Sequence, residues 1–373
     1  MKQREGGSEM AITAETDQGY KTAMGVAWEF DYDVDVQALE NLYEKAKALQ
    51  WNVTEDIDWD REVDPSRPIL EGEGFGLSQM PLFQRLSKTQ QDDLRAHTAA
   101  YRLSQFMHGE QGALMTAATL SHSVPDYEAK LYSATQTMDE ARHVEVFQKY
   151  LDKLAIVYPM SPFLKDLIDA TLKSDHWVKI AIGMNIVVEG IAMGAFHNMK
   201  RVTGCDLLRD ITELTMRDEA RHVAFGYLYV GHALGEMHPD DREEAADFAL
   251  AAIDMMAPTL GREDPRSSRG SGGDPRSGTG RGDPGFVKVL VHSGIDPLDF
   301  AAGVREAKEA GISLEPRRGT VRIMEDLVMP ALSRVGAITD RTHEILKERG
   351  VEVNRDTSVL EKLEEVETGT AEL

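Results

Sequence analysis

Apolar residues recur at every third or fourth position over most of the chain, a period that predicts α-helices. Runs with the two-residue alternation of a strand are scarce, so the pattern predicts an all-α protein. The two longest helical regions are separated by a short break that contains a proline, which is typical of a helical hairpin. The predicted helices of the first two thirds are 33–49, 88–123, 127–154, 174–202, 205–234 and 239–257.

The residue pattern divides the chain into four predicted parts. Residues 1–86 hold a polar start, one helix and an irregular segment rich in aromatic, acidic and proline residues. Residues 87–258 form the predicted helical bundle. Residues 259–285 are rich in Gly, Pro, Ser and Arg and cannot bury a core, so we expect a flexible loop. Residues 286–373 are predicted to form further helices and an acidic tail.

The charge balance and the cysteine count exclude several classes of protein. With 64 acidic and 41 basic residues the formal charge is −23, which argues against nucleic acid or an anionic membrane as a partner. Cys205 is the single cysteine, so an intrachain disulfide and a cysteine-based metal site are both excluded. The start lacks the apolar run of a signal peptide, and the chain lacks a long uninterrupted apolar run. We therefore expect a cytoplasmic protein.

One hexapeptide, Asp-Glu-Ala-Arg-His-Val, occurs at 139–144 and again at 218–223. Both copies lie in predicted helices, where residues three apart share a face. Glu140 with His143, and Glu219 with His222, therefore each present a carboxylate beside an imidazole. One such pair is common on a solvated helix face, so the motif needs further support before it indicates metal binding.

Two further glutamates, Glu110 and Glu189, are separated by the same interval as the two copies of the motif. Each precedes the glutamate of its motif by 30 residues, which is about 45 Å along a straight helix. A turn midway between the two glutamates of each half would bring them level with each other across an antiparallel pair of helices. The midpoints are Pro125 and Gly204, residue types that end helices. Each half of the bundle is therefore predicted to be a helical hairpin with its two glutamates at matched depth.

Glu110 and Glu189 lie among apolar residues, where an unpaired charge is costly to bury. A buried pair with arginine or lysine is the alternative to a metal ion, but 175–199 offers few basic residues. Four glutamates and two histidines in a bundle suit two bridged metal ions, and this ligand set favours iron or manganese over structural zinc. The predicted metal ligands are Glu110, Glu140, His143, Glu189, Glu219 and His222.

As a set, these residues resemble the motif of the ferritin-like di-iron carboxylate superfamily, over about 90–230. The resemblance implies a ferritin-like four-helix bundle, and the residue pattern adds N- and C-terminal helices to it. It also implies two iron ions, with a manganese–iron pair as the alternative. The expected function is activation of O2.

The flanking residues resemble those of bacterial di-iron monooxygenases. Asp139 and Asp218 precede the motif glutamates, and Arg142 and Arg221 precede the histidines. The resemblance implies that each aspartate supports the histidine of the other motif and that the arginines hold the aspartates. The alternative is that these residues are exposed helix charges.

At three positions the chain can be compared with individual branches of the superfamily. Ribonucleotide reductase small subunits, which the chain also resembles, carry a radical tyrosine where this chain has Phe147, so no tyrosyl radical is expected there. The monooxygenases often carry threonine where this chain has Met193. The p-aminobenzoate N-oxygenase-like enzymes are similar in size and layout, but they carry an additional histidine ligand at the position of Thr215. The chain thus resembles the superfamily without matching one branch at every position.

The elements added before and after the bundle favour an enzyme over an iron-storage protein. We expect a di-iron oxygenase or oxidase that hydroxylates or N-oxygenates a small hydrophobic or aromatic substrate, with no catalytic group assigned beyond the metal site. The predicted pocket residues are Met107, Leu114, Phe147, Met193, Phe196 and Thr215.

The expected partners are O2, the organic substrate and an electron donor, either a reductase or a ferredoxin. Neither nucleic acid nor a membrane is expected, and a homodimer stays open. Two alternatives to the oxygenase also stay open: a ferroxidase or iron-handling protein without an organic substrate, and a manganese–iron ligand-binding oxidase.

Overall fold

The computed structural model describes these stretches of the chain: 24–63, 77–154, 156–256, 283–312, 322–359 and 361–362. Every regular element in these stretches is a helix, which confirms the all-α prediction. The predicted flexible loop lies outside the described residues except for 283–285, and so does the segment 1–23.

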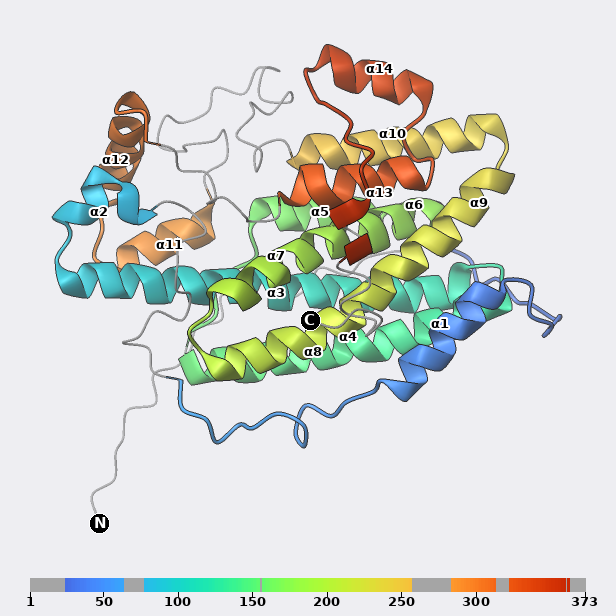
Figure 1. The fold of residues 1–373 in the computed structure, drawn as a ribbon, viewed down its shortest axis with the longest axis horizontal. Coiled ribbons are helices and arrows are strands. Elements are labelled where there is room, and N and C mark those ends of the chain that lie inside the picture. Colours follow the sequence, from blue (N-terminus) through green and yellow to red (C-terminus); the bar gives the residue numbers. More distant parts are fainter. Residues whose placement is uncertain are drawn as a thin grey trace.

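Four long helices form the centre of the molecule (Figure 1). They are α3 (Lys88–Ser123), α4 (Tyr127–Leu154), α7 (Glu189–Val202) and α8 (Asp206–Phe225). The helices α3 and α4 form one hairpin, α7 and α8 form the other, and α4 packs against α8. The bounds of α3 and α4 agree with the predicted helices. Ser87 begins α3 because its hydroxyl accepts from the backbone N–H of Gln90 in a capping box.

The remaining elements surround this bundle (Figure 1). The helix α1 packs on α4 and α8, α11 packs on α3, and α10 packs on α5 and α6. Their bounds are α1 Gln37–Ala48, η1 Leu77–Gln79, α2 Pro81–Arg85, α5 Pro162–Leu172, α6 Trp177–Ala181, η2 Ile182–Val188, η3 Gly226–Val230, α9 Gly231–Glu236, α10 Pro239–Met256, α11 Pro284–His292, α12 Pro297–Glu309, η5 Ile323–Val328, α13 Met329–Arg334 and α14 Asp340–Glu348.

The two helices predicted over 174–202 and 205–234 are each interrupted by a π-helical segment, η2 and η3. The apolar period is nearly the same in both helix types, so the sequence pattern did not reveal the interruptions. The two segments lie against each other at Gly226, where an added Cβ would come 2.9 Å from the backbone oxygen of Asn185. A glycine at this position therefore permits the close approach. Segments of this kind are frequent at functional sites.

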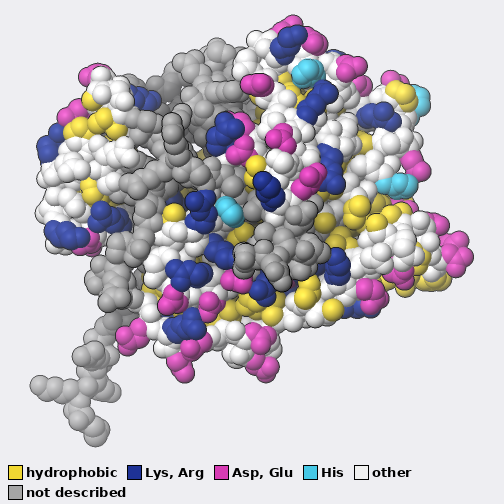
Figure 2. Space-filling model, in the orientation of Figure 1, with side chains coloured by type: hydrophobic (Ala, Val, Ile, Leu, Met, Phe, Trp, Pro, Cys, Tyr) yellow, Lys and Arg dark blue, Asp and Glu magenta, His cyan; other side chains and the backbone are white. Residues whose placement is uncertain are grey.

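The buried apolar residues form two clusters, one toward each end of the bundle. One contains Tyr132, Met184 and Phe225, and the other contains Phe147 and Phe196. Charged side chains of both signs are scattered over the described part of the face shown in Figure 2. Buried polar residues occupy the middle of the bundle, between the two apolar clusters.

The stretch Trp177–Val202 is long and apolar enough to cross a membrane by length and composition alone. Within its most apolar window, 78% is buried inside the protein. It includes α7, a central helix of the bundle, and this position explains its hydrophobicity without a membrane.

We predict that Gly226→Ala destabilises the protein by about 1–3 kcal/mol, because backbone rather than a movable side chain lies in the way of the new methyl group. The midpoint of chemical unfolding measures the effect. Gly235→Ala is the matched control, because Gly235 is also helical and an added Cβ meets nothing within 4 Å there. Equal midpoints for the two variants would contradict the prediction.

Candidate metal centre

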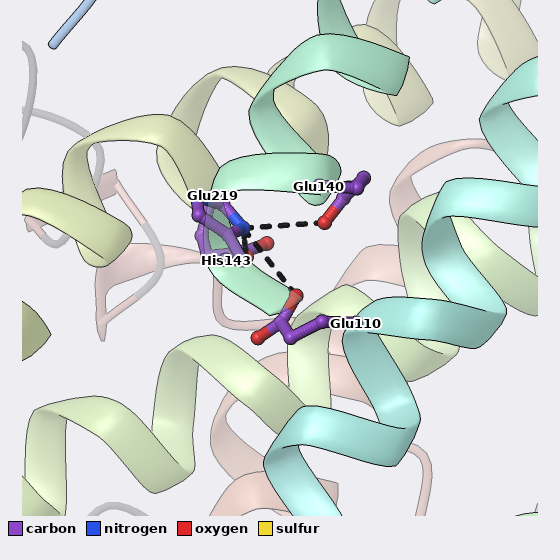
Figure 3. A group of neighbouring side chains, drawn as sticks. All are labelled: Glu110, Glu140, His143 and Glu219. Atoms are coloured by element: carbon purple, nitrogen blue, oxygen red, sulfur yellow. Dashed lines mark hydrogen bonds and ion pairs between the residues drawn. The ribbon is translucent and has the colours of Figure 1, made fainter. Parts of the chain in front are cut away.

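The six predicted ligands converge in the middle of the bundle, and we call them the ligand cluster. Each is at most 4% exposed. Figure 3 shows four of them pointing toward one another from α3, α4 and α8. The cluster takes one residue from α3, two from α4, one from α7 and two from α8: Glu110; Glu140 and His143; Glu189; Glu219 and His222.

The two imidazoles face the carboxylates through the same ring atom, Nδ1. His143 Nδ1 lies 3.3 Å from Glu110, 3.2 Å from Glu140 and 3.2 Å from Glu219. His222 Nδ1 lies 3.1 Å from Glu140 and 3.3 Å from Glu219. The distance from His222 Nδ1 to Oε1 of Glu189 is 3.9 Å. Each histidine is therefore surrounded by three carboxylates.

Two of the carboxylates are shared between the histidines. Glu140 directs Oε2 to His143 and Oε1 to His222. Glu219 directs Oε1 to His143 and Oε2 to His222. This arrangement defines two positions for a metal ion, a first at His143 and a second at His222, with one private glutamate each and two glutamates in common.

The spacing of these atoms suits metal ions. Two ligand atoms at about 2.1 Å from one ion, at right or tetrahedral angles, are about 3.0–3.4 Å apart. Most of the separations given above fall in that interval. Moreover, Glu219 Oε1 is buried and its 3.2 Å contact with His143 Nδ1 is not a hydrogen bond, as expected of two atoms that share a metal ion. Four carboxylates and two imidazoles therefore fit two ions of iron or manganese.

The pKa values of the carboxylates differ with the number of imidazoles that each one meets. Burial, followed by the nearby charge of Glu219, raises the pKa of Glu110 and of Glu189 well above the usual value. Burial also acts to raise the pKa of Glu140, but the two histidines outweigh it and lower the pKa well below the usual value. The shared carboxylates are thus the ones held ionised in the metal-free protein.

The other ring nitrogen of each histidine meets the aspartate of the opposite motif. His143 Nε2 lies 3.1 Å from Asp218, and His222 Nε2 lies 3.3 Å from Asp139. With Nε2 protonated and donating to the carboxylate, Nδ1 keeps a lone pair for a metal ion. The aspartates therefore select the tautomer that the ligand cluster requires.

Two buried arginines neutralise these aspartates. Arg142 forms ion pairs with Asp139 and, at 2.9 Å, with Asp218. Arg221 forms ion pairs with the same two aspartates. All four residues are buried, so the alternative of exposed helix charges is wrong. We call these four residues the arginine–aspartate layer.

Two residues just after α1 complete this layer, and sequence reasoning missed both. The indole Nε1–H of Trp51 donates to Asp218 at 2.7 Å, and the ring lies under the guanidinium of Arg142. The amide of Gln50 donates to Asp139 at 3.0 Å and accepts from Arg142. Gln50 also lines a surface groove of about 310 Å³ between α1 and α4. No spacing relates these residues to the repeated motif, so only the fold reveals them.

Sequence reasoning also missed two buried amides, Gln136 and Asn185. Gln136 Nε2 donates to Glu140 at 3.1 Å and to Glu189 at 3.2 Å. Asn185 Nδ2 donates to Gln136 Oε1 at 2.9 Å. A signal was available here, because each amide precedes a ligand glutamate by four positions and so lies one helical turn from it.

The opposite end of the ligand cluster is apolar. Phe106, Phe147 and Phe196 pack together with ring centroids 4.6–5.9 Å apart, and we call them the phenylalanine wall. Of the other predicted pocket residues, Met193 and Thr215 are fully buried, whereas Met107 and Leu114 are half-buried. The hydroxyl of Thr215 has no hydrogen-bond partner. The assignment of these residues to a substrate pocket stays a prediction.

Whole-chain similarity to curated proteins and solved structures is low. A search of curated proteins finds no match. The solved structure of an R2-like ligand-binding oxidase with aerobically reconstituted metal cofactor after photoconversion is 15% identical, with a TM-score of 0.41, over 88% of this chain and 96% of that chain. An R2-like ligand-binding oxidase with aerobically reconstituted Mn/Fe cofactor (long soak) is 17% identical, with a TM-score of 0.39, over 85% and 94%. TM-scores and identities this low do not assign the chain to a family. The assignment rests on a match between the sequence and a family.

That sequence match spans residues 33–272, which is more than half of the chain, and it includes the whole ligand cluster. It confirms the predicted superfamily and the predicted oxidoreductase, and it selects the N-oxygenase-like branch among those compared above. The chain belongs to the family described as p-aminobenzoate N-oxygenase AurF.

Proposed function

We propose that the ligand cluster holds two metal ions, two irons or a manganese–iron pair, and that the protein uses them to oxygenate a small aromatic amine with O2. The observation that carries the proposal is the sharing of Glu140 and Glu219 between the two histidines. Two ions held by common carboxylates would bind O2 together and supply electrons to it. The family description, p-aminobenzoate N-oxygenase, supports the amine as the substrate class.

In this reaction one oxygen atom of O2 joins the amine nitrogen and the other leaves as water. The conversion of an amine to a hydroxylamine then consumes two electrons and two protons, which an electron donor must supply. The phenylalanine wall offers an apolar surface for an aromatic ring beside the first metal position. Thr215, buried with a free hydroxyl, would hydrogen-bond a polar substituent of the substrate.

The chain's own residues hold the charges of the site in place. The arginine–aspartate layer fixes the tautomer of both histidines, and two buried arginines neutralise its aspartates. Trp51 and Gln50 connect this layer to the surface near α1, so we propose that the electron donor, a reductase or ferredoxin, docks on that side. A cytoplasmic location fits the single cysteine, and a homodimer stays a prediction.

Aromatic amines should be oxygenated at nitrogen by the reduced, iron-loaded protein. The protein is reduced anaerobically and then mixed with ¹⁸O2 and p-aminobenzoate or aniline. Mass spectrometry should find one ¹⁸O in a hydroxylamine product, or more after repeated turnover, together with matching O2 uptake. Uptake of O2 with iron oxidation but without any oxygenated product from either amine would favour the iron-handling alternative and contradict the proposal.

Alanine substitutions should separate the shared ligands from the private ones. Glu110→Ala and Glu189→Ala should each lower bound metal from two ions per chain to one, whereas Glu140→Ala should remove both. Elemental analysis after anaerobic loading measures the ratio. Glu145→Ala is the control on α4, because Glu145 is exposed and pairs with Lys149. Two ions retained by Glu189→Ala would refute the ligand assignment.

Metal binding should stabilise the protein more at pH 8 than at pH 6. In the metal-free fold the pKa values of Glu110, Glu189, His143 and His222 are raised, so their stabilising contribution is complete at low pH and is lost as pH rises through those values. Metal ions replace these protons. The shift in thermal midpoint caused by Mn²⁺, measured anaerobically at both pH values, tests this. An equal or smaller shift at pH 8 would contradict it.

A further inference from the structure

The two metal positions are built from equivalent ligands but have different surroundings. The interval between the two copies of the motif also relates Glu110 to Glu189 and Glu140 to Glu219. The same interval relates Gln136 to Thr215 and Phe106 to Asn185, and each member of these two pairs lies one turn before a ligand glutamate: Phe106, Gln136, Asn185 and Thr215. The second position is flanked by two amides, and the first is flanked by a hydroxyl and a phenyl ring.

The side-chain amide of Gln136 holds both carboxylates of the second position. Its Nε2 donates to Glu140 Oε1, the oxygen that faces His222, and to Glu189 Oε1. Gln136 is fully buried, so water does not compete for these bonds. Metal ligation requires both carboxylates to be ionised, and an ionised carboxylate only accepts hydrogen bonds, so the NH2 end of Gln136 must face the two glutamates in the metal-bound protein.

Asn185 fixes the orientation of Gln136. Its Nδ2 donates to Gln136 Oε1 at 2.9 Å and to the backbone oxygen of His222 at 3.3 Å. Asn185 lies in η2, and its backbone is pressed against Gly226 of η3. The π-helical segments therefore position the asparagine, the asparagine orients the glutamine, and the glutamine orients two ligands. We call Gln136 and Asn185 the amide clamp.

The first metal position has no counterpart of this clamp among the equivalent residues. The hydroxyl of Thr215 is buried without any hydrogen-bond partner, so it does not reach Glu110 or Glu219. Phe106 has no polar group, and its ring packs in the phenylalanine wall instead. Glu110 is therefore oriented by the ligand cluster itself, without an amide behind it.

We propose that the amide clamp makes the two metal positions unequal: the second position binds its ion tightly, and the first binds its ion more weakly and exchanges it more readily. Ligands that are held before binding lose less freedom when the ion arrives, and outer partners of metal ligands are typically worth about 10–100-fold in affinity. The inference rests on the proposed ligand assignment. Gln136 and Asn185 act through the ligands and are positioning residues.

Replacement of Gln136 by leucine tests the proposal, because leucine keeps much of the volume and removes both donors. In an anaerobic Mn²⁺ titration, with free ion counted by electron paramagnetic resonance, the wild type should show one tighter and one weaker site. Gln136→Leu should weaken the tighter site about 10–100-fold and change the weaker one by less than about 3-fold. Ser133→Ala, one turn earlier on α4, removes a buried hydroxyl that has no partner and is the control.

Two backgrounds identify which position changes. In Glu110→Ala protein only the second position remains, so Gln136→Leu should weaken binding there about 10–100-fold. In Glu189→Ala protein only the first position remains, so the same substitution should leave affinity within about 3-fold. If Gln136→Leu fails to fold by circular dichroism, Asn185→Ala replaces it, and a smaller loss at the second position alone is expected.

Three results would overturn the inference: two equal sites in the wild type, equal weakening of both sites by Gln136→Leu, or weakening of neither. These outcomes differ from failure of the proposed function. Failure of the ligand assignment would appear in the wild type as fewer than two bound ions, or in Glu189→Ala as two. A lack of amine oxygenation with two unequal metal sites would leave the clamp intact and refute only the substrate.

Discussion

Burial of four glutamates in an apolar bundle is the constraint on which the rest of the structure depends. Isolated carboxylates are too costly to keep ionised there, so each must be protonated, paired or bound to a metal ion. The cluster meets this requirement with imidazoles on one side and, one layer further out, with two aspartates neutralised by two arginines. Helix packing, turn positions and the segment after α1 all bring these groups to one level of the bundle.

The repeated motif produces a nearly symmetric set of ligands, and the surroundings remove the symmetry. One end of the cluster meets the phenylalanine wall, and the other meets the amide clamp. The proposed inequality of the two metal positions follows from this difference, because an amide supports the ligands at one end and phenyl rings pack at the other.

Thr215 is a position at which this chain differs from the N-oxygenase-like enzymes that it resembles. The N-oxygenase-like enzymes it resembles carry a histidine there, and this chain has a buried hydroxyl without a partner. The cluster in this chain thus contains two histidines, each surrounded by three carboxylates. The small side chain also leaves the first metal position without a polar support behind Glu110.

The sequence by itself determined the helices and the kinds of ligand. The helices 88–123 and 127–154 were predictable because an amphipathic period and a proline break are local properties. The pairing of Glu110 with Glu140 followed from equal distances to a turn. The π-helical segments could not be predicted, because their apolar pattern is close to that of an α-helix.

Only the tertiary structure decided which glutamates are shared, and that Gln50, Trp51, Gln136 and Asn185 support the cluster. These contacts join residues as far as 167 positions apart, and they depend on how the two hairpins face each other. Spacing along one helix sets which side chains share a face. The packing of helices against one another sets which faces meet, and no local pattern records that choice.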